Sequence, residues 1–461
     1  MKIEFQGAAG TVTGSRYLLS EGQTHVLVDC GLFQGYKFLR LKNWEEFPLE
    51  PKEISAIILT HAHLDHSGYV PVLVKNGFQG PIFSTAATKD LASLILRDSG
   101  YLQQEEANFA NKHKFSKHHP ALPLYTEKDA ERSLESFQIL DWQQKRTIST
   151  STGTRLDFEF YPAGHLLGAS SVFMKFDGRT LGFSGDLGRF KDPIMPPPSF
   201  PVGVDYLVVE STYGDRVHDI QNPKEQILEM VEKTIQRGGT ILIPSFSVGR
   251  AQLVLYYLHE LQKEGRLPEV PIYLNSPMAS RANDLFSKHG EETLCTKETI
   301  KFICSVARAV SSVEESIRLN EDRRPKIIIA ASGMATGGRV LHHLKTLAPD
   351  PRNTILFVGF QAGGTRGDAL VRGAREIKIH GENWPVRAEV VPLDCMSAHA
   401  DGDELIEWIN RLHKKPERVF ITHGEPHSAD TLRYRIEHEL GIEASVPQQG
   451  DVFDFEHLRF E

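Results

Sequence analysis

The sequence predicts an α/β protein with more than one domain. A chain of 461 residues is longer than a single hydrophobic core usually supports, so two domains are the natural expectation. The first part of the chain is rich in short apolar or alternating runs, which are typical of β-strands. Between about residues 206 and 380, strand and helix patterns alternate, and this alternation is typical of a parallel sheet covered by helices.

The first part of the chain contains the clearest short strands. The expected strands are residues 2–6, 16–19, 25–28, 54–59, 156–161, 171–176 and 180–184, and helical patterns cover 90–96 and 127–137. The strand 54–59 is apolar on both faces, which favours a position inside a layered fold. Five prolines in residues 193–201 predict a rigid connection and a domain boundary.

The alternating region predicts a regular succession of elements. Its expected strands are residues 206–209, 240–244, 270–274, 326–331 and 354–359, and its expected helices are 223–236, 251–263 and 279–288. After about residue 387, further strand and helix patterns follow at 390–391, 405–413 and 418–422.

Composition and charge exclude several classes of protein. Hydrophobic residues make up 40% of the chain, and the apolar runs are too short to cross a bilayer. The four cysteines include no CxxC pair, which disfavours a thiolate metal site. We therefore expect a cytoplasmic protein with reduced thiols. The net charge of −8 disfavours nonspecific adhesion to nucleic acid, but it does not exclude a nucleic-acid substrate.

A cluster of metal-binding residue types follows the strand 54–59. The segment His61-Ala62-His63-Leu64-Asp65-His66 places three imidazoles and one carboxylate at the end of a buried strand. These groups suit zinc or a similar divalent ion, and strand ends are where α/β folds usually place their sites. Four donors exceed what one tetrahedral ion takes while keeping a position open, so the loop favours a pair of ions. The alternative is a solvated loop in which Asp65 caps a helix.

Further candidate ligands follow other expected strands. They are acids and histidines that lie beside small residues: Asp29, His165, Asp186 and His423. Taken singly, each is more often a capping acid or a histidine with an ordinary hydrogen bond. Together they form a coherent set that could complete the metal site.

In chain order, Asp29, the HxHxDH loop, His165, Asp186 and His423 resemble the motifs of the metallo-β-lactamase fold. The resemblance implies a four-layer αββα domain, made from about residues 1–205 and 381–461, and two Zn²⁺ per chain. It implies that one zinc is bound by His61, His63 and His165, and that the second is bound by Asp65, His66 and His423. Asp186 would bridge both ions, and Asp29 would orient the ligands through hydrogen bonds.

Three later segments are similar to motifs A, B and C of the β-CASP family, the nucleic-acid-processing branch of this fold. They are Glu210-Ser211-Thr212-Tyr213-Gly214, Ser397-Ala398-His399-Ala400-Asp401 and Thr422-His423-Gly424-Glu425. In this family a second domain is inserted into the first, and residues 206–380 have the right place and length for it. The layout resembles the compact bacterial and archaeal relatives of the nuclease subunit of the cleavage and polyadenylation specificity factor.

The resemblance implies a zinc-dependent ribonuclease that hydrolyses RNA phosphodiester bonds. The histidine at motif C is similar to that of RNA-cleaving members, whereas DNA-repair members typically carry an apolar residue there. The implied catalytic residues are Asp65, Glu210 and His399, with His399 as general acid oriented by Glu210. A histidine suits proton donation near neutral pH. Internal cleavage, 5′-to-3′ removal of nucleotides or both remain open, as does a homodimer.

Three turns of the inserted region end strands and open helices, so their amide groups could meet an anion. They span residues 244–250, 331–339 and 359–367. Each alone is most often only a turn, but all three resemble loops that hold the RNA backbone in β-CASP nucleases. The candidate contacts are Ser245, Ser247, Arg250, Ser332, Gly333, Thr365 and Arg366.

Three other functions compete with this hypothesis. A DNA nuclease of the same family is disfavoured by His423. A small-molecule thioester or ester hydrolase of the same fold is disfavoured by the inserted domain and by Glu210 and His399. A noncatalytic RNA-binding subunit is disfavoured because the chain retains the complete ligand set.

Overall fold

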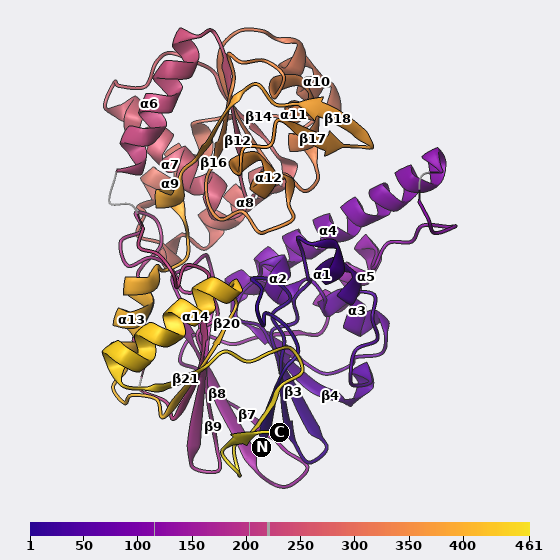
Figure 1. The fold of residues 1–461 in the computed structure, drawn as a ribbon, viewed down its shortest axis with the longest axis vertical. Helices are drawn as coiled ribbons and strands as arrows, with labels where there is room; N and C mark the ends of the chain where they lie inside the picture. Colours follow the sequence, from indigo (N-terminus) through magenta and orange to yellow (C-terminus); the bar gives the residue numbers. More distant parts are fainter. Residues whose placement is uncertain (115, 202, 219–221) are drawn as a thin grey trace. The chain divides into compact units, whose positions relative to one another are not determined.

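The computed structural model describes residues 1–114, 116–201, 203–218 and 222–461. The chain forms two compact units (Figure 1). Unit 1 contains Met1–Val217 and His399–Glu461, and unit 2 contains His218–Ala398. Among the described residues, no helix combines the length and the apolar character that a membrane span requires.

Unit 1 contains two mixed β-sheets that face each other. The first sheet has the order β23-β22-β1-β2-β3-β4-β5-β6 and the second β21-β20-β11-β10-β9-β8-β7. The strands of the first are β1 (Lys2–Phe5), β2 (Tyr17–Glu21), β3 (Thr24–Val28), β4 (Ile54–Ile58), β5 (Ile82–Ser84), β6 (Phe137–Ile139), β22 (Val452–Asp454) and β23 (Arg459–Phe460). Those of the second are β7 (Arg146–Ser149), β8 (Arg155–Pro162), β9 (Ser170–Phe176), β10 (Arg179–Phe183), β11 (Tyr206–Glu210), β20 (Arg418–Thr422) and β21 (Glu443–Ser445).

The core of unit 1 lies between these sheets. In β8, the buried rings of Phe158 and Phe160 alternate with the partly exposed Glu159, as expected for a strand with one face in the core. The ring of Phe420 in the second sheet lies with its centroid 5.4 Å from that of Phe5 and 4.9 Å from that of Phe453 in the first. Aromatic contacts therefore join the two sheets.

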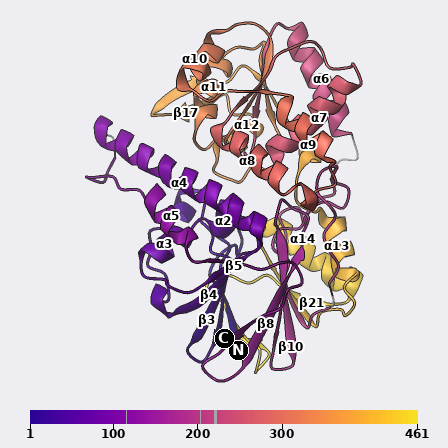
Figure 2. The same ribbon diagram turned by 180° about the vertical axis from the view of Figure 1, so that it is seen from behind.

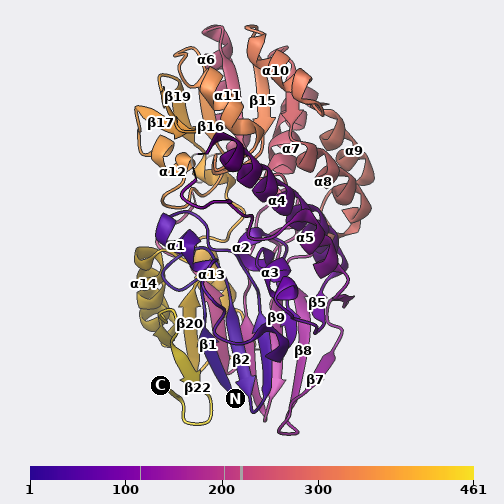
Figure 3. The same cartoon turned by 90° about the vertical axis from the view of Figure 1, so that its right-hand side faces the viewer.

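Helices cover the outer faces of both sheets (Figures 1 and 3). On the side of the first sheet lie α2 (Leu64–Ser67), α3 (Val70–Lys75), α4 (Ala86–His113) and α5 (Glu127–Leu134), and on the side of the second lie α13 (Gly402–Asn410) and α14 (Pro426–Arg435). Capping boxes at Thr126 and Asp401 begin α5 and α13. The short helix α1 (Lys37–Lys42) follows β3. This layering confirms the αββα arrangement that the resemblance implied.

Unit 2 is built around a parallel sheet with the order β14-β13-β15-β12-β16-β19. Figure 2 shows helices lying over this sheet. Its strands are β12 (Thr240–Pro244), β13 (Ile272–Asn275), β14 (Arg308–Ala309), β15 (Lys326–Ala330), β16 (Thr354–Phe357) and β19 (Glu389–Pro392). Its helices are α6 (Pro223–Gln236), α7 (Arg250–Lys263), α8 (Pro277–Lys288), α9 (Lys297–Ser305), α10 (Val313–Glu321), α11 (Arg339–Leu347) and α12 (Arg366–Val371), and β17 (Glu376–Ile379) pairs with β18 (Glu382–Pro385). The central strands β12 and β15 are buried at every position, which confirms the parallel α/β expectation.

Strand β11, at residues 206–210, lies in unit 1 and not in unit 2. It pairs in parallel with β10 and β20, both in the second sheet of unit 1. Its apolar pattern is the same as that of the strands in unit 2, so the sequence alone does not show which sheet it joins. The chain passes from unit 1 to unit 2 between Val217 and His218, and it returns to unit 1 between Ala398 and His399. The domain boundaries expected from the sequence, at 205/206 and 380/381, stay a prediction.

Phe158→Ala should lower the free energy of unfolding by about 3–5 kcal/mol, because loss of a fully buried ring leaves a cavity between the sheets. The ring of Phe158 lies with its centroid 5.3 Å from that of Phe83. Urea unfolding followed by circular dichroism measures the change. Tyr101→Ala on α4, where the side chain is 50% exposed, is the control and should change stability by less than about 0.5 kcal/mol. Equal effects of the two substitutions would contradict this packing.

Candidate metal centre

The histidines and acids singled out in the sequence meet at one end of the two sheets of unit 1. Each lies just beyond the carboxyl end of a strand: Asp29 after β3, His61 after β4, His165 after β8, Asp186 after β10 and His423 after β20. The residues that complete the set, His63, Asp65 and His66, lie between β4 and the end of α2. The fold therefore gathers residues from five strand ends at one edge.

Three histidine nitrogens and one carboxylate oxygen converge in a first group of donor atoms. Both His61 Nε2 and His165 Nε2 lie 3.2 Å from His63 Nδ1. Asp186 Oδ2 lies 3.4 Å from His61 Nε2 and 3.6 Å from His165 Nε2. A tetrahedral zinc ion with ligands at about 2.0–2.1 Å separates its donor atoms by about 3.3 Å. These four atoms therefore have the spacing that one ion requires.

A second group of donor atoms lies on the other side of Asp186. His66 Nε2 lies 3.1 Å from His423 Nε2 and 3.2 Å from Asp186 Oδ1, and Asp65 Oδ2 lies 3.6 Å from His423 Nε2. Asp186 Oδ1 is buried and accepts no hydrogen bond from the described residues. A buried oxygen without a donor is costly, and a cation would satisfy it. The residues present therefore fit a bound metal, and Asp186 faces both groups, one oxygen to each.

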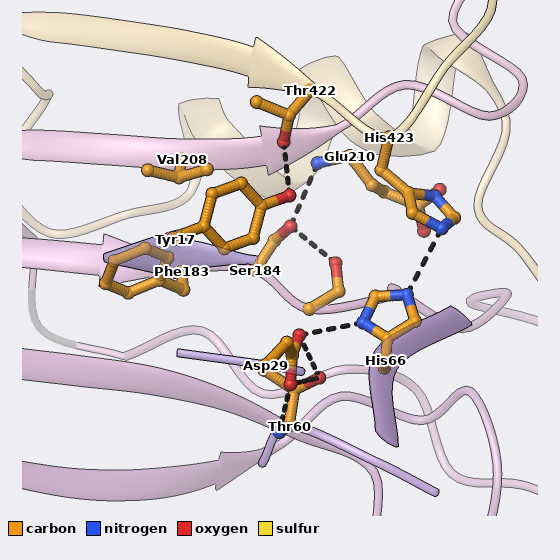
Figure 4. Close-up of a pocket in the computed structure, with 11 residues that line it drawn as sticks. Tyr17, Asp29, Thr60, His66, Phe183, Ser184, Val208, Glu210, Thr422 and His423 are labelled. Carbon is orange, nitrogen blue, oxygen red and sulfur yellow. Dashed lines mark hydrogen bonds and ion pairs between the residues drawn. The ribbon is translucent and has the colours of Figure 1, made fainter. Parts of the chain in front are cut away.

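Hydrogen bonds on the far side of the rings fix their orientation, and Figure 4 shows the one between His66 and Asp29. His66 Nδ1 donates to Asp29 Oδ2 at 2.7 Å. His61 Nδ1 donates to Thr60 Oγ1 at 3.1 Å, and the Thr60 hydroxyl donates to the Asp29 carboxylate. His423 Nδ1 donates to Thr212 Oγ1 at 3.1 Å. Each bond directs the Nε2 lone pair of its ring toward the donor groups.

Thr60 and Thr212 were missed when the sequence was considered alone. Thr60 directly precedes the histidine-rich loop, and Thr212 lies two residues after Glu210 in motif A. A threonine in such a position could have suggested a hydrogen-bond partner for a ligand. The partner of Thr212, however, is a histidine 211 positions away, and no local pattern reveals that contact.

The backbone is strained at two of these residues. Asp29 has φ 58° and His423 has φ 48°, a region that non-glycine residues enter at a cost of about 1–3 kcal/mol. Both amides are held, since Asp29 N donates to Ile58 O and His423 N donates to Ala8 O. Gly31 allows the chain after Asp29 to lie against the ligand loop, because a Cβ at Gly31 would lie 1.7 Å from Asp65 O.

Burial and neighbouring charges set the protonation of the site. Burial lowers the pKa of His61, His63 and His165, that of His63 to about 3, so these rings are neutral. Burial alone would raise the pKa of Asp186, but the surrounding histidines outweigh it and hold the pKa well below the usual range. Burial would lower the pKa of His66, but the carboxylates of Asp186 and Asp29 hold this pKa well above the ordinary histidine value. Metals bind charged carboxylates and neutral imidazoles, so His61, His63 and His165 are already in the binding form, whereas His66 releases a proton when a metal binds.

His399 and Glu210 lie beside the donor groups. His399 Nδ1 lies 3.0 Å from Glu210 Oε2, and Glu210 Oε1 accepts a hydrogen bond from Leu187 N at 2.7 Å. The ring of His399 lies with its centroid 4.5 Å from that of His165. The side chain of Glu210 is 1% exposed and that of His399 is 16% exposed. The structure thus places a partly exposed imidazole in front of a buried carboxylate, next to the candidate ligands.

The candidate phosphate-binding residues lie on three loops of unit 2. These loops follow β15, β12 and β16, which are neighbours in the parallel sheet, so the loops share its carboxyl edge. A Cβ at Gly333 would lie 2.7 Å from the ring of Phe246, so the first two loops touch. Ser245 and Ser247 are buried, with Ser247 Oγ 3.2 Å from Ser276 Oγ, and Ser332 Oγ lies 3.0 Å from Thr336 Oγ1.

Two of the candidate residues at this carboxyl edge, Thr365 and Arg366, already form hydrogen bonds within unit 2. Arg366 donates to Lys378 O at 2.7 Å and to Ala335 O at 3.3 Å. Thr365 Oγ1 accepts from Asp368 N and caps α12. Arg250 is buried, and a Cβ at Gly359 would lie 3.4 Å from its Nε. The side chains of Thr365 and Arg366 therefore stabilise the loop, and their role toward a phosphate stays a prediction.

Comparison with known proteins places the chain in a family. Residues 9–83 match the metallo-β-lactamase superfamily, residues 251–370 the Beta-Casp domain, and residues 383–447 a Zn-dependent metallo-hydrolase RNA specificity domain. The chain is 38% identical over 432 residues to Ribonuclease TTHA0252 of Thermus thermophilus, covering 92% of this chain and 93% of that protein. The chain belongs to the β-CASP family of the metallo-β-lactamase superfamily. It is a metal-dependent hydrolase.

Other relatives of this β-CASP protein cover nearly its whole length. It is 33% identical to the Transcription termination factor FttA of Pyrococcus abyssi, over 98% of this chain and 71% of that protein. It is 29% identical to an RNase J-like protein of Methanocaldococcus jannaschii, over 98% of this chain and 99% of that protein. A crystal structure of a protein of unknown function from Enterococcus faecalis V583 shares the fold, with TM-score 0.51 and 12% identity over 98% of this chain and 99% of that chain.

Asp29→Asn should lower the affinity of the site for zinc by about 10–100-fold, because His66 loses the charged partner that fixes its Nδ1 proton. Competition with a chromophoric chelator measures the affinity. Asp141→Asn, which changes an exposed carboxylate outside the site, is the control. Wild-type affinity in Asp29→Asn would contradict the orienting role of this residue.

Proposed function

We propose that this protein is a zinc-dependent ribonuclease that hydrolyses the phosphodiester bonds of RNA. The observation that carries the proposal is the pair of His399 and Glu210, with His399 Nδ1 3.9 Å from Asp186 Oδ2. Cleavage of a phosphodiester requires a proton for the leaving oxygen, and a histidine supported by a carboxylate can supply it. The Thermus relative is named a ribonuclease and a Methanocaldococcus relative is named RNase J-like, which supports RNA as the substrate.

Two zinc ions per chain are part of this proposal. One would be held by His61, His63, His165 and Asp186 Oδ2, and the other by Asp65, His66, His423 and Asp186 Oδ1. Support comes from the separation of 3.1 to 3.6 Å between neighbouring donor atoms and from the two-sided position of Asp186. When bound, zinc makes a water molecule nucleophilic near neutral pH and neutralises charge that builds on the phosphoryl oxygens.

The side chains of the protein would donate the proton, hold the proton donor in place and orient the ligands. Glu210 accepts the Nδ1 proton of His399, so the second proton of a cationic ring lies on Nε2, from which it passes to the leaving oxygen. The same carboxylate stabilises the cationic ring, and the amide of Leu187 holds that carboxylate in place. Asp65 contributes through the carboxylate that binds metal, and Asp29 through the orientation of His66.

The loops at the carboxyl edge of the sheet in unit 2 would bind the RNA backbone. Residues Ser245, Ser247, Arg250, Ser332 and Gly333 line the two touching loops, and Thr365 and Arg366 begin α12 on the third. Loops that open helices at this edge of a parallel sheet present amide groups to an anion. Their contribution would be to affinity for the strand rather than to the chemical step.

Two alternatives have less support. A DNA nuclease is disfavoured by the histidine at motif C, and a small-molecule thioester hydrolase by the pairing of His399 with Glu210 and by the Beta-Casp match over residues 251–370. The proposal covers internal cleavage and 5′-to-3′ removal of nucleotides.

His399→Ala should retain the zinc content of the wild type and lose about 10²–10⁴-fold in RNA cleavage, because the proton donor is absent while the ligand set is intact. Elemental analysis measures zinc, with two ions per chain expected in both proteins, and labelled RNA measures turnover. Glu210→Gln should give a smaller loss of turnover, since the imidazole remains. Normal turnover in a zinc-loaded His399→Ala protein would contradict the assigned role.

Among matched substrates, the zinc-loaded protein should cleave RNA and leave both DNA of the same sequence and a thioester uncleaved. End-labelled oligonucleotides of each kind make the comparison, and a ladder of products indicates internal cleavage whereas mononucleotides indicate removal from an end. Faster turnover of DNA or of the thioester would replace the proposed function by the corresponding alternative.

A further inference from the structure

A cluster of large apolar side chains is exposed around the short helix α1 of unit 1. Tyr36 is 43% exposed, Phe38 62%, Leu41 51% and Trp44 58%. The rings of Tyr36 and Phe38 are stacked, with centroids 5.7 Å apart and an interplanar angle of 17°. Isolated exposed apolar residues are common, but several aromatic residues together on one short segment mark an interaction surface.

This segment is anchored while its aromatic side chains face outward. Leu39 is buried beneath α1. Asn43 accepts a hydrogen bond from Phe33 N at 2.9 Å and donates one to Phe33 O at 2.8 Å. The cluster is therefore presented in a fixed conformation, which reduces the entropy that a ligand would otherwise cost on binding.

Cations are concentrated on α1 itself, in a chain with a net charge of −8. Helix α1 contains Lys37, Arg40 and Lys42 and no acidic residue, and the exposed Glu45 and Glu46 follow Trp44. Within the described residues, neither Lys37 nor Arg40 has an ion pair within 4.0 Å. Arg266 of unit 2, by contrast, is paired with Glu225 at 2.6 Å. Lys37 and Arg40 are therefore available to an anionic ligand.

The chain segment that leads to α1 is hydrogen-bonded to the loop that carries the candidate ligands. Asp29 begins the connection that leads to α1, and Cys30 N donates to His66 O at 2.7 Å while Leu32 N donates to Leu64 O at 2.8 Å. The chain that enters α1 is thus hydrogen-bonded to α2, which carries Asp65 and His66, and Figure 3 shows α1 beside α2. A strand bound at the donor groups could extend over this surface.

We propose that Tyr36, Phe38 and Trp44, with Lys37 and Arg40, form a platform on which bases of single-stranded RNA stack while the cations contact its phosphates. This inference rests on the proposed ribonuclease function and adds a second contact surface for the same substrate. Single-stranded RNA combines planar apolar faces with regular negative charge, which are the two properties that this surface complements. An acidic protein segment would match the charge but not a row of exposed rings.

The test compares His399→Ala protein, which binds without cleaving, with the same protein carrying Phe38→Ala and Trp44→Ala. Fluorescence anisotropy with a labelled uridine oligonucleotide of about 10–16 nucleotides measures Kd, and the double change should raise Kd about 10–100-fold. Phe302→Ala, which removes an aromatic ring that is 43% exposed on α9, is the matched control and should leave Kd unchanged. Circular dichroism verifies that each variant is folded.

Two further measurements separate stacking from a structural effect. RNA should quench the fluorescence of Trp44, and Trp44→Phe should abolish that quenching while keeping Kd within about twofold, because a planar ring remains. Lys37→Ala and Arg40→Ala should each reduce the slope of log Kd against log salt by about 0.7.

An unchanged Kd in the double variant would overturn the platform and favour a protein partner for this surface. That result is distinct from failure of the proposed function. If the wild-type protein neither binds nor cleaves the oligonucleotide, the ribonuclease proposal fails. If the wild-type protein cleaves the oligonucleotide and the double change leaves Kd unchanged in the His399→Ala protein, only the platform fails.

Discussion

The buried carboxylate of Asp186 is the group on which the rest of the site depends. It is 2% exposed, and nitrogens of His66, His61, His165 and His423 lie 3.2 to 3.6 Å from its two oxygens. An isolated carboxylate at this depth would be strongly destabilising, so its burial is stable only with positive charge or donors on both sides. The positions of the histidine loop, of His165 and of His423 therefore follow from a single electrostatic requirement at the end of β10.

Meeting that requirement strains the chain locally, and the surrounding structure offsets the strain. Asp29 and His423 adopt positive φ angles at the ends of β3 and β20, one in each sheet. The packed core between the sheets, including the contact of Phe420 with Phe5, fixes these strand ends in space. Since the hydrogen bonds of Thr60 and Thr212 then hold the rings, the donor atoms are preorganised by the protein, and a metal meets a set already at its required spacing.

The candidate metal centre and the proposed RNA-stacking platform are built on different kinds of structure. The donor groups and the pair of Glu210 with His399 lie on strand ends and on connections hydrogen-bonded to them, where positions are set by the sheets. The exposed rings and cations around α1 lie on a short surface helix that is secured by Leu39 and Asn43. Rigid support suits groups that must match the geometry of a reaction, whereas stacking on exposed rings tolerates different bases.

The sequence by itself determined the family and several of the longer strands and helices, because alternating hydrophobicity, cap residues and the HxHxDH loop are local patterns. It did not predict the short helices α1 to α3, and it extended the helix that ends at Leu134 to residue 137, where β6 begins. Helix α6 at Pro223–Gln236 and strand β12 at Thr240–Pro244 have the bounds that were predicted from composition and periodicity. Only the tertiary structure decided that β11 joins unit 1, that Arg366 donates to backbone carbonyls, and that Thr212 orients His423. It also decided which nitrogen of His399 meets Glu210, 189 residues away. These facts depend on contacts between segments distant in the chain, and a local pattern contains no information about which distant group will close a hydrogen bond.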